Sequence, residues 1–185
     1  MTRKDIPNLI SALRIVLVIP VVWALLSEKF TTALILFAIA GFSDALDGFL
    51  AKRYHWESRL GSILDPIADK LLLVASFASL TWLGLLPAWL LWIVLGRDVV
   101  IVAGGLTYHY RLGQFDLTPL WSSKINTLLQ ILLVLAVILQ QYVAIPLLDS
   151  IIQIGIWLVV ASVVNSGTEY IAVWGLRAWR QSRNQ

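Results

Sequence analysis

Six long apolar runs, separated by short polar joints, constrain this chain more than any other feature of its sequence. Each run is close to or longer than the roughly 20 residues that an α-helix needs to cross a bilayer about 30 Å thick. Of the 185 residues, 59% are hydrophobic and 14% are charged, which is not the composition of a soluble domain. The sequence predicts an all-α integral membrane protein, a bundle of six transmembrane helices over residues 9–26, 31–54, 62–82, 87–110, 123–144 and 147–174.

The joints between these runs are short and contain no low-complexity linker, so we expect one membrane domain over residues 1–185. No convincing internal repeat is present, which disfavours a transporter built from inverted repeats. Cysteine is absent, so disulfide and thiolate chemistry are excluded.

The basic residues of the joints and ends predict the orientation. With the N-terminus in the cytoplasm, Lys29 falls in an outer joint and the other basic joints face inward, so both termini are expected to be cytoplasmic. The net charge of +3 then lies largely on the inner surface, which favours anionic membrane lipids as partners and not nucleic acid. The first run contains Arg14 and lacks an evident signal-peptide cleavage site, and we expect a bacterial inner membrane.

Four carboxylates lie at the ends of the second and third runs. An ionised side chain deep in a membrane costs about 2.5 to 3.5 kcal/mol on insertion scales, and crowded carboxylates repel one another, so a bound divalent metal is the simplest explanation. Residues three, four and seven apart share a helix face. Two facing stripes are therefore expected, one on each helix: Asp44, Asp47, Gly48 and Ala51 on the second, and Gly61, Asp65 and Asp69 on the third.

All-oxygen ligation favours Mg²⁺ or Mn²⁺, and His55 and His109 are too few and too far apart in sequence to indicate zinc. Structural ion pairing is the alternative interpretation of the acids. It would need nearby cations, such as Lys52, Arg53 or Lys70, but it would not need small residues on the same helix faces.

The acids and glycines form a longer motif. The stretch 44–69 reads Asp-x2-Asp-Gly-x2-Ala-Lys-x8-Gly-x3-Asp-x3-Asp, which resembles the signature of the CDP-alcohol phosphatidyltransferases at every position except Lys52, where the family usually has arginine. Lysine keeps the charge but loses the bidentate geometry, and Arg53 is the neighbour that would compensate. The opening Pro7-Asn8-x2-Ser11-x2-Arg14 is similar to the family's Pro-Asn-x2-Thr-x2-Arg.

The resemblance implies a six-helix enzyme, usually a homodimer, that displaces CMP from CDP-diacylglycerol with an alcohol acceptor. By that similarity two Mg²⁺ or Mn²⁺ ions are held by Asp44, Asp47, Asp65 and Asp69. Asp69 is also implied as the general base, a role that the residues alone do not separate from ligation. The nucleotide is expected to contact Asn8, Ser11, Asp47, Gly48, Ala51, Lys52, Arg53 and Gly61.

Two cations outside the signature are candidates for binding the acceptor. Arg97 lies inside the fourth run, where an unpaired charge is costly, and Lys124 begins the fifth. An ion pair of Arg97 with Asp98 or a motif acid, and a snorkelling role for Lys124, are the alternatives.

The segments 28–30, 96–99 and 123–127 resemble the cardiolipin synthase branch of the family most. Phosphatidylglycerophosphate synthases usually carry Lys-x-Lys-Thr where this chain has Lys124-x-Asn126-Thr127. One basic residue fewer suits the monoanionic diester of phosphatidylglycerol better than dianionic glycerol 3-phosphate. Cardiolipin synthesis is thus the predicted activity and phosphatidylglycerophosphate synthesis the runner-up. A cation transporter is remoter, because the outer halves of the runs are mostly apolar.

Overall fold

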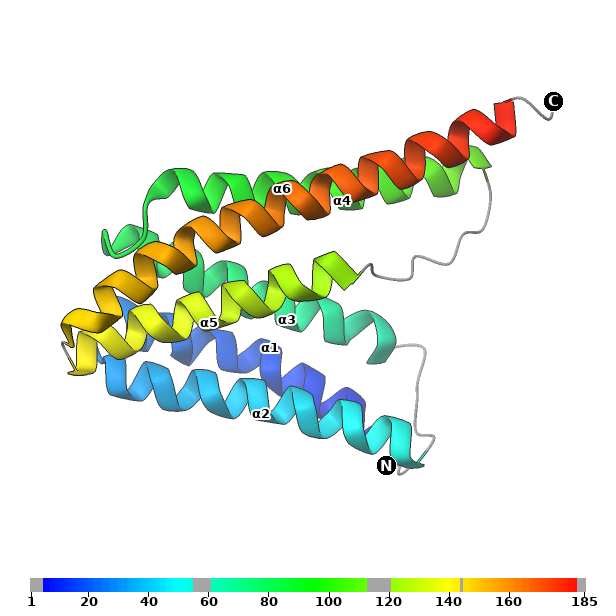
Figure 1. Ribbon diagram of the computed structural model, residues 1–185. Coiled ribbons are helices and arrows are strands. Elements are labelled where there is room, and N and C mark those ends of the chain that lie inside the picture. Colours follow the sequence, from blue (N-terminus) through cyan, green and yellow to red (C-terminus); the bar gives the residue numbers. More distant parts are fainter. Residues whose placement is uncertain (1–4, 55–60, 113–120, 144, 183–185) are drawn as a thin grey trace. The chain divides into compact units, whose positions relative to one another are not determined.

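The structure of the chain is a computed structural model that describes the backbone of residues 5–54, 61–112, 121–143 and 145–182. Side chains are described for residues 10–43, 53–54, 65–104, 121–143 and 145–170. The described part is all-α and contains six helices (Figure 1): α1 (Asp5–Leu26), α2 (Phe30–Tyr54), α3 (Gly61–Trp82), α4 (Ala88–Leu112), α5 (Trp121–Val143) and α6 (Pro146–Ser182). The predicted class and helix number are confirmed. The largest differences in the ends are at α1, which begins at Asp5, and α6, which continues to Ser182.

Length and hydropathy identify two stretches within the described residues that could cross a membrane, Trp121–Val143 and Pro146–Tyr170. Within the described residues of the first two helices, shorter apolar stretches are Ile10–Leu26 and Phe30–Ser43. The motif acids Asp44 and Asp47 follow the second of these stretches in the same helix.

Tight turns follow α1 and α3. Glu28 after α1 and Gly84 after α3 both adopt the left-handed conformation, with φ of 55° and 73°, and each turn carries the two backbone hydrogen bonds of a Schellman motif. Lys29 also places its Nζ atom 4.3 Å from the centroid of the Trp23 ring. These turns explain why the joints after α1 and α3 need only a few residues.

The chain divides into two compact units, Met1–Leu86 with Val134–Leu148, and Pro87–Leu133 with Asp149–Gln185. In the first unit α1 packs against both α2 and α3. The helices of this unit contribute buried side chains that include Val21, Leu25, Phe37, Phe77 and Leu80. Dense van der Waals contacts among these buried side chains stabilise the cluster of three helices.

In the second unit α5 and α6 run antiparallel. Ser162 of α6 donates a hydrogen bond of 2.8 Å to Oδ1 of Asn126 in α5. Nearer the other end of both helices, Leu133 Cδ1 lies 3.2 Å from the point that a Cβ on Gly155 would occupy. Gly155 therefore lets the two backbones approach closely, as small residues do between membrane helices.

Candidate active site

Two motif acids of α3 contact polar residues of α1. Ser11 donates a hydrogen bond to Oδ1 of Asp65, and the guanidinium of Arg14 lies 2.5 Å from Oδ1 of Asp69. The acids are four residues apart and their partners are three apart, so each pair lies about one helical turn from the other. Because the contacts advance along both helices together, α1 and α3 run parallel.

Burial differs sharply between the two sides of these contacts. Ser11 and Arg14 are 0% and 1% exposed, whereas the side chain of Asp69 is 42% exposed and Asp65 is half-buried. The carboxylates therefore have one side against α1 and remain accessible from another. Oxygen ligands that a cation can still reach suit a hard divalent ion.

Most of the other predicted signature residues have side chains outside the described set. The backbone of α2 is helical from Phe30 through Tyr54, so the spacing of Asp44 and Asp47 places them on one helix face as predicted. Seven side chains of the predicted site lie outside the described residues: Asn8, Asp44, Asp47, Gly48, Ala51, Lys52 and Gly61. Arg53, which is described, is exposed.

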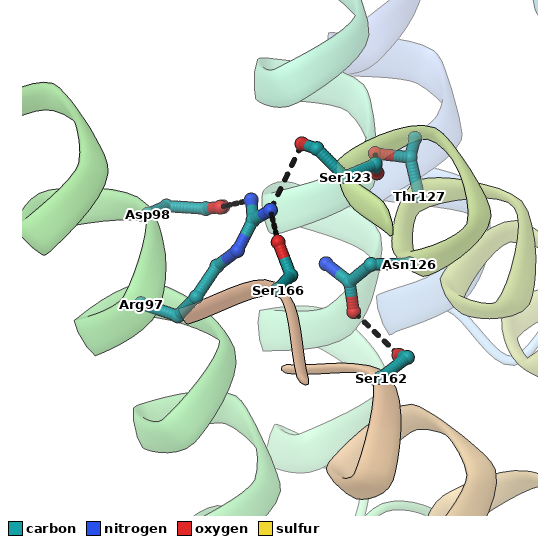
Figure 2. Close-up of polar contacts among 7 residues, drawn as sticks. All are labelled: Arg97, Asp98, Ser123, Asn126, Thr127, Ser162 and Ser166. Carbon is teal, nitrogen blue, oxygen red and sulfur yellow. Dashed lines mark hydrogen bonds and ion pairs between the residues drawn. The ribbon is translucent and has the colours of Figure 1, made fainter. Parts of the chain in front are cut away.

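The second unit contains a buried polar cluster centred on Arg97 (Figure 2). Nη1 of Arg97 pairs with Asp98 at 2.9 Å, and Nη2 donates to Ser123 at 2.8 Å and to Ser166 of α6. The residue is 8% exposed, and its guanidinium carbon lies 5.9 Å from the ring centroid of Tyr170. Arg97 thus forms the ion pair with Asp98 that the sequence analysis gave as the alternative to acceptor binding. The same guanidinium also joins α4 to α5 and α6.

Asn126 extends this cluster along α5. Its side chain is fully buried, and its Oδ1 accepts the hydrogen bond from Ser162, on the α6 side of the helix (Figure 2). Within the described part of the second unit, Nδ2 of Asn126 and Nε of Arg97 are buried donors with no hydrogen-bond partner. Buried donors of this kind are costly unless water or a ligand satisfies them.

An open groove lies on α5 beside the cluster, with a volume of about 330 Å³. One part is polar, with Ser123, Lys124 and Thr127, and the other is apolar, with Leu128 and Ile131. Lys124 is exposed, and its Nζ lies 4.9 Å from the ring centroid of Trp121. The groove thus has a cationic, hydroxyl-lined part next to an apolar one, and its volume is at the lower end of small-molecule sites.

Comparison with known families identifies the chain. The family model for CDP-alcohol phosphatidyltransferase matches residues 4–168, which include both unit-1 contacts and the Arg97 cluster up to Ser166. The chain belongs to this family. Its members are membrane enzymes of phospholipid synthesis that are generally metal-dependent. The resemblance drawn from the signature is therefore confirmed.

Relatives within the family carry two different names. The chain is 39% identical over 147 residues to a cardiolipin synthase (CMP-forming) of Rattus norvegicus, covering 71% of this chain and 49% of that protein. It is 38% identical over 112 residues to the corresponding synthase of Streptomyces coelicolor, covering 56% and 52%. It is also 33% identical over 135 residues to a CDP-diacylglycerol–glycerol-3-phosphate 3-phosphatidyltransferase of Aquifex aeolicus, covering 72% and 75%. The chain spans about half the length of these two cardiolipin synthases.

The family's dependence on metal fits the residues that α3 presents. Asp65 and Asp69 provide carboxylate oxygens one turn apart, both accessible in part, and the signature adds two further acids on α2. Among the described side chains no group of three metal-binding residues occurs, and Asp44 and Asp47 are not in that set. The donor chemistry of the acids is that of a Mg²⁺ or Mn²⁺ site.

The sequence did not predict that Arg14 would contact the acids. The cations considered as partners were those near the acids in sequence, whereas Arg14 is 55 positions from Asp69. One signal was available, because Arg14 interrupts the apolar run of α1 three residues after Ser11. A charge in such a run commonly marks a functional or ion-paired position.

Proposed function

We propose that this protein is a cardiolipin synthase, which transfers the phosphatidyl group of CDP-diacylglycerol to phosphatidylglycerol and releases CMP. The groove of α5 carries the choice of acceptor, because a polar cationic part beside an apolar part fits a lipid phosphodiester better than a small water-soluble phosphate. In this proposal residues 1–185 form one domain of six spans. It lies in a bacterial inner membrane as a homodimer, with both termini and the reaction site on the cytoplasmic side.

The reaction joins the free glycerol hydroxyl of phosphatidylglycerol to the lipid-linked phosphorus of CDP-diacylglycerol, and the bond from that phosphorus to the CMP oxygen breaks. Asp69 accepts the hydroxyl proton, a role for which its partial exposure is suitable. Two Mg²⁺ or Mn²⁺ ions would be held by Asp44, Asp47, Asp65 and Asp69. When bound, they would neutralise negative charge on the diphosphate and on the leaving CMP.

The nucleotide end of CDP-diacylglycerol is assigned to the remaining signature residues. These comprise Asn8, Ser11, Asp47, Gly48, Ala51, Lys52, Arg53 and Gly61. The hydroxyl of Ser11 is bound to Asp65, so in this proposal Ser11 also fixes an acid next to the nucleotide. Exposed Arg53 has the freedom to reach a phosphate.

The acceptor phosphate is assigned to Lys124, with the hydroxyls of Ser123 and Thr127 beside it in the groove. Arg97 supports this site through its bond to Ser123, and its buried position makes it a poor first contact for a ligand from the bilayer. The apolar side chains of Leu128 and Ile131 would receive the start of an acyl chain. Burying apolar surface there adds affinity that glycerol 3-phosphate cannot obtain.

Phosphatidylglycerophosphate synthesis is the second candidate, and a specific observation favours it. The Aquifex aeolicus relative is covered over 75% of its own length, against 49% for the rat cardiolipin synthase. In this second candidate reaction the acceptor would be glycerol 3-phosphate, which reaches Lys124 from water and leaves the apolar part of the groove unused.

The test is a product analysis with purified protein in detergent. The protein receives CDP-diacylglycerol, Mn²⁺ or Mg²⁺, and either phosphatidylglycerol or glycerol 3-phosphate, in parallel with the Asp69→Asn variant. Cardiolipin and CMP from the unmutated protein, with loss of both in the variant, are expected. Phosphatidylglycerophosphate as the product would reverse the choice of acceptor. No CMP with either alcohol, together with cation flux in proteoliposomes, would favour the transporter.

A further inference from the structure

Arg14 is the largest fully buried side chain among the described residues. It lies inside the apolar part of α1, between Leu13 and Ile15, where a buried charge is costly unless it is paired. Its Nη1 atom is 2.5 Å from Oδ1 of Asp69, and its side chain is 0% exposed. An arginine kept in such a place needs partners, and one partner of Arg14 is the acid at the end of the signature.

The ion pair is one-sided in its exposure. The guanidinium is fully covered by protein, whereas the carboxylate of Asp69 is 42% exposed. An ordinary surface ion pair would expose both groups, and such pairs contribute little to stability. Here the cation lies behind the carboxylate and leaves part of it accessible, which is the arrangement expected of a group that orients another group for a ligand.

A second contact fixes the register of the two helices. Ser11, one turn before Arg14, donates to Asp65, one turn before Asp69. Two side-chain contacts at matching turns limit both the sliding and the rotation of α3 against α1. Arg14 therefore holds its acid within a helix pair whose register is already fixed, and the planar guanidinium adds directionality to the contact.

We propose that Arg14 is a positioning residue, which holds the Asp69 carboxylate from its buried side so that the exposed side is presented to the reactants and to the metal. The role rests on the proposed function, in which Asp69 accepts the proton and binds metal. It goes beyond that function by assigning to α1 the orientation of the reacting acid. Arg14 acts through Asp69 and contacts no reactant itself.

The test compares Arg14→Gln and Arg14→Lys with Val21→Ala, a control on the same helix that removes buried apolar contacts seven residues away. Folded protein is quantified for each variant, and then kcat, KM for CDP-diacylglycerol and the thermal shift produced by Mn²⁺ without substrates are measured. Arg14→Gln is expected to lower kcat about 10- to 100-fold and to raise the Mn²⁺ concentration for half-maximal thermal shift about 10-fold, as for other groups that orient metal ligands. KM for the lipid should change little.

The conservative variant and the control make the outcome decisive. Arg14→Lys keeps the charge but loses the planar geometry, so it should recover part of kcat. Val21→Ala should lower the melting temperature while kcat per folded molecule and the Mn²⁺ response stay unchanged. Wild-type kcat and Mn²⁺ response in folded Arg14→Gln would overturn the proposal and leave only a structural ion pair. If Arg14→Gln does not fold, a wild-type kcat and a wild-type Mn²⁺ response in Arg14→Lys overturn the proposal equally.

Failure of the proposed function is distinguishable from failure of this inference. If the unmutated protein releases no CMP from CDP-diacylglycerol, the proposed reaction is wrong, and the Mn²⁺ thermal shift still compares Arg14→Gln with Val21→Ala. A large rise in KM for CDP-diacylglycerol at unchanged kcat would assign Arg14 to substrate binding and overturn its role as a positioning residue.

Discussion

The buried pair of Arg97 and Asp98 should contribute measurably to the stability of the second unit. Their side chains are 5% and 14% exposed, so replacing Arg97 by methionine removes a cation from beside a nearly buried carboxylate. Breaking such a pair costs about 3 to 5 kcal/mol. Asp98 keeps a further interaction, which places the expected cost at the low end, about 3 kcal/mol.

Arg97→Met also removes two hydrogen bonds, to Ser123 and Ser166. Side-chain hydrogen bonds between membrane helices average about 0.6 kcal/mol each, so together they add about 1 kcal/mol. The single variant should therefore lose about 4 kcal/mol. The double variant Arg97→Met with Asp98→Leu also removes the carboxylate that Arg97 pairs with, and it should lose only about 1 kcal/mol.

Equilibrium unfolding of the purified protein, by titrating a denaturing detergent into a mild one and following helix content by circular dichroism, measures these differences. Lys124→Met serves as the control, because it removes an exposed cation from the same region and should cost less than about 1 kcal/mol. The reasoning is refuted if the double variant is as unstable as Arg97→Met, since the loss would then not come from a buried carboxylate left without Arg97.

Two further changes test the groove and the α5–α6 packing. Leu128→Gln should raise KM for phosphatidylglycerol about fivefold, equivalent to about 1 kcal/mol of lost apolar contact in a half-exposed groove. Leu132→Gln, on the same helix but outside the groove, should leave this KM unchanged. Equal effects of the two variants on KM would contradict the assignment of the groove to the lipid. Gly155→Val should destabilise the second unit by about 1 to 3 kcal/mol in thermal unfolding, because its Cβ would lie 3.2 Å from Leu133 Cδ1. A Cβ at Gly167 meets nothing within 4 Å, so Gly167→Ala should be tolerated. Similar losses of stability in both variants would refute the packing argument.

The helices could be predicted from sequence because their signals are local. Apolar runs of span length and short polar joints determine where each helix begins and ends, and the structure follows them closely. The helical extension of α6 to Ser182 was missed because Arg177 and Arg180 end the apolar pattern without ending the helix. Hydropathy thus measures where lipid can surround a helix, and backbone hydrogen bonding continues beyond that point.

The candidate site could be predicted only in part, because spacing within a helix does not reveal partners on other helices. The spacing of Asp65 and Asp69 correctly placed them one turn apart on α3. Their contacts with Ser11 and Arg14 depend on how α1 packs, and the serine of α6 that binds Arg97 is 69 positions away in the chain. Such pairings follow from tertiary packing, and no residue pattern in the sequence indicates which partner is chosen.

The parallel contact between α1 and α3 makes the first helix a mechanical part of the candidate active site. Asp65 and Asp69 can move only if α1 moves with them or if both side-chain contacts break. A reporter group on α1, for example at exposed Leu13, would therefore detect ligand binding at acids that belong to another helix. A shortened or fused form that replaces α1 with an unrelated apolar helix would still insert into a membrane, but its acids would no longer be held in place.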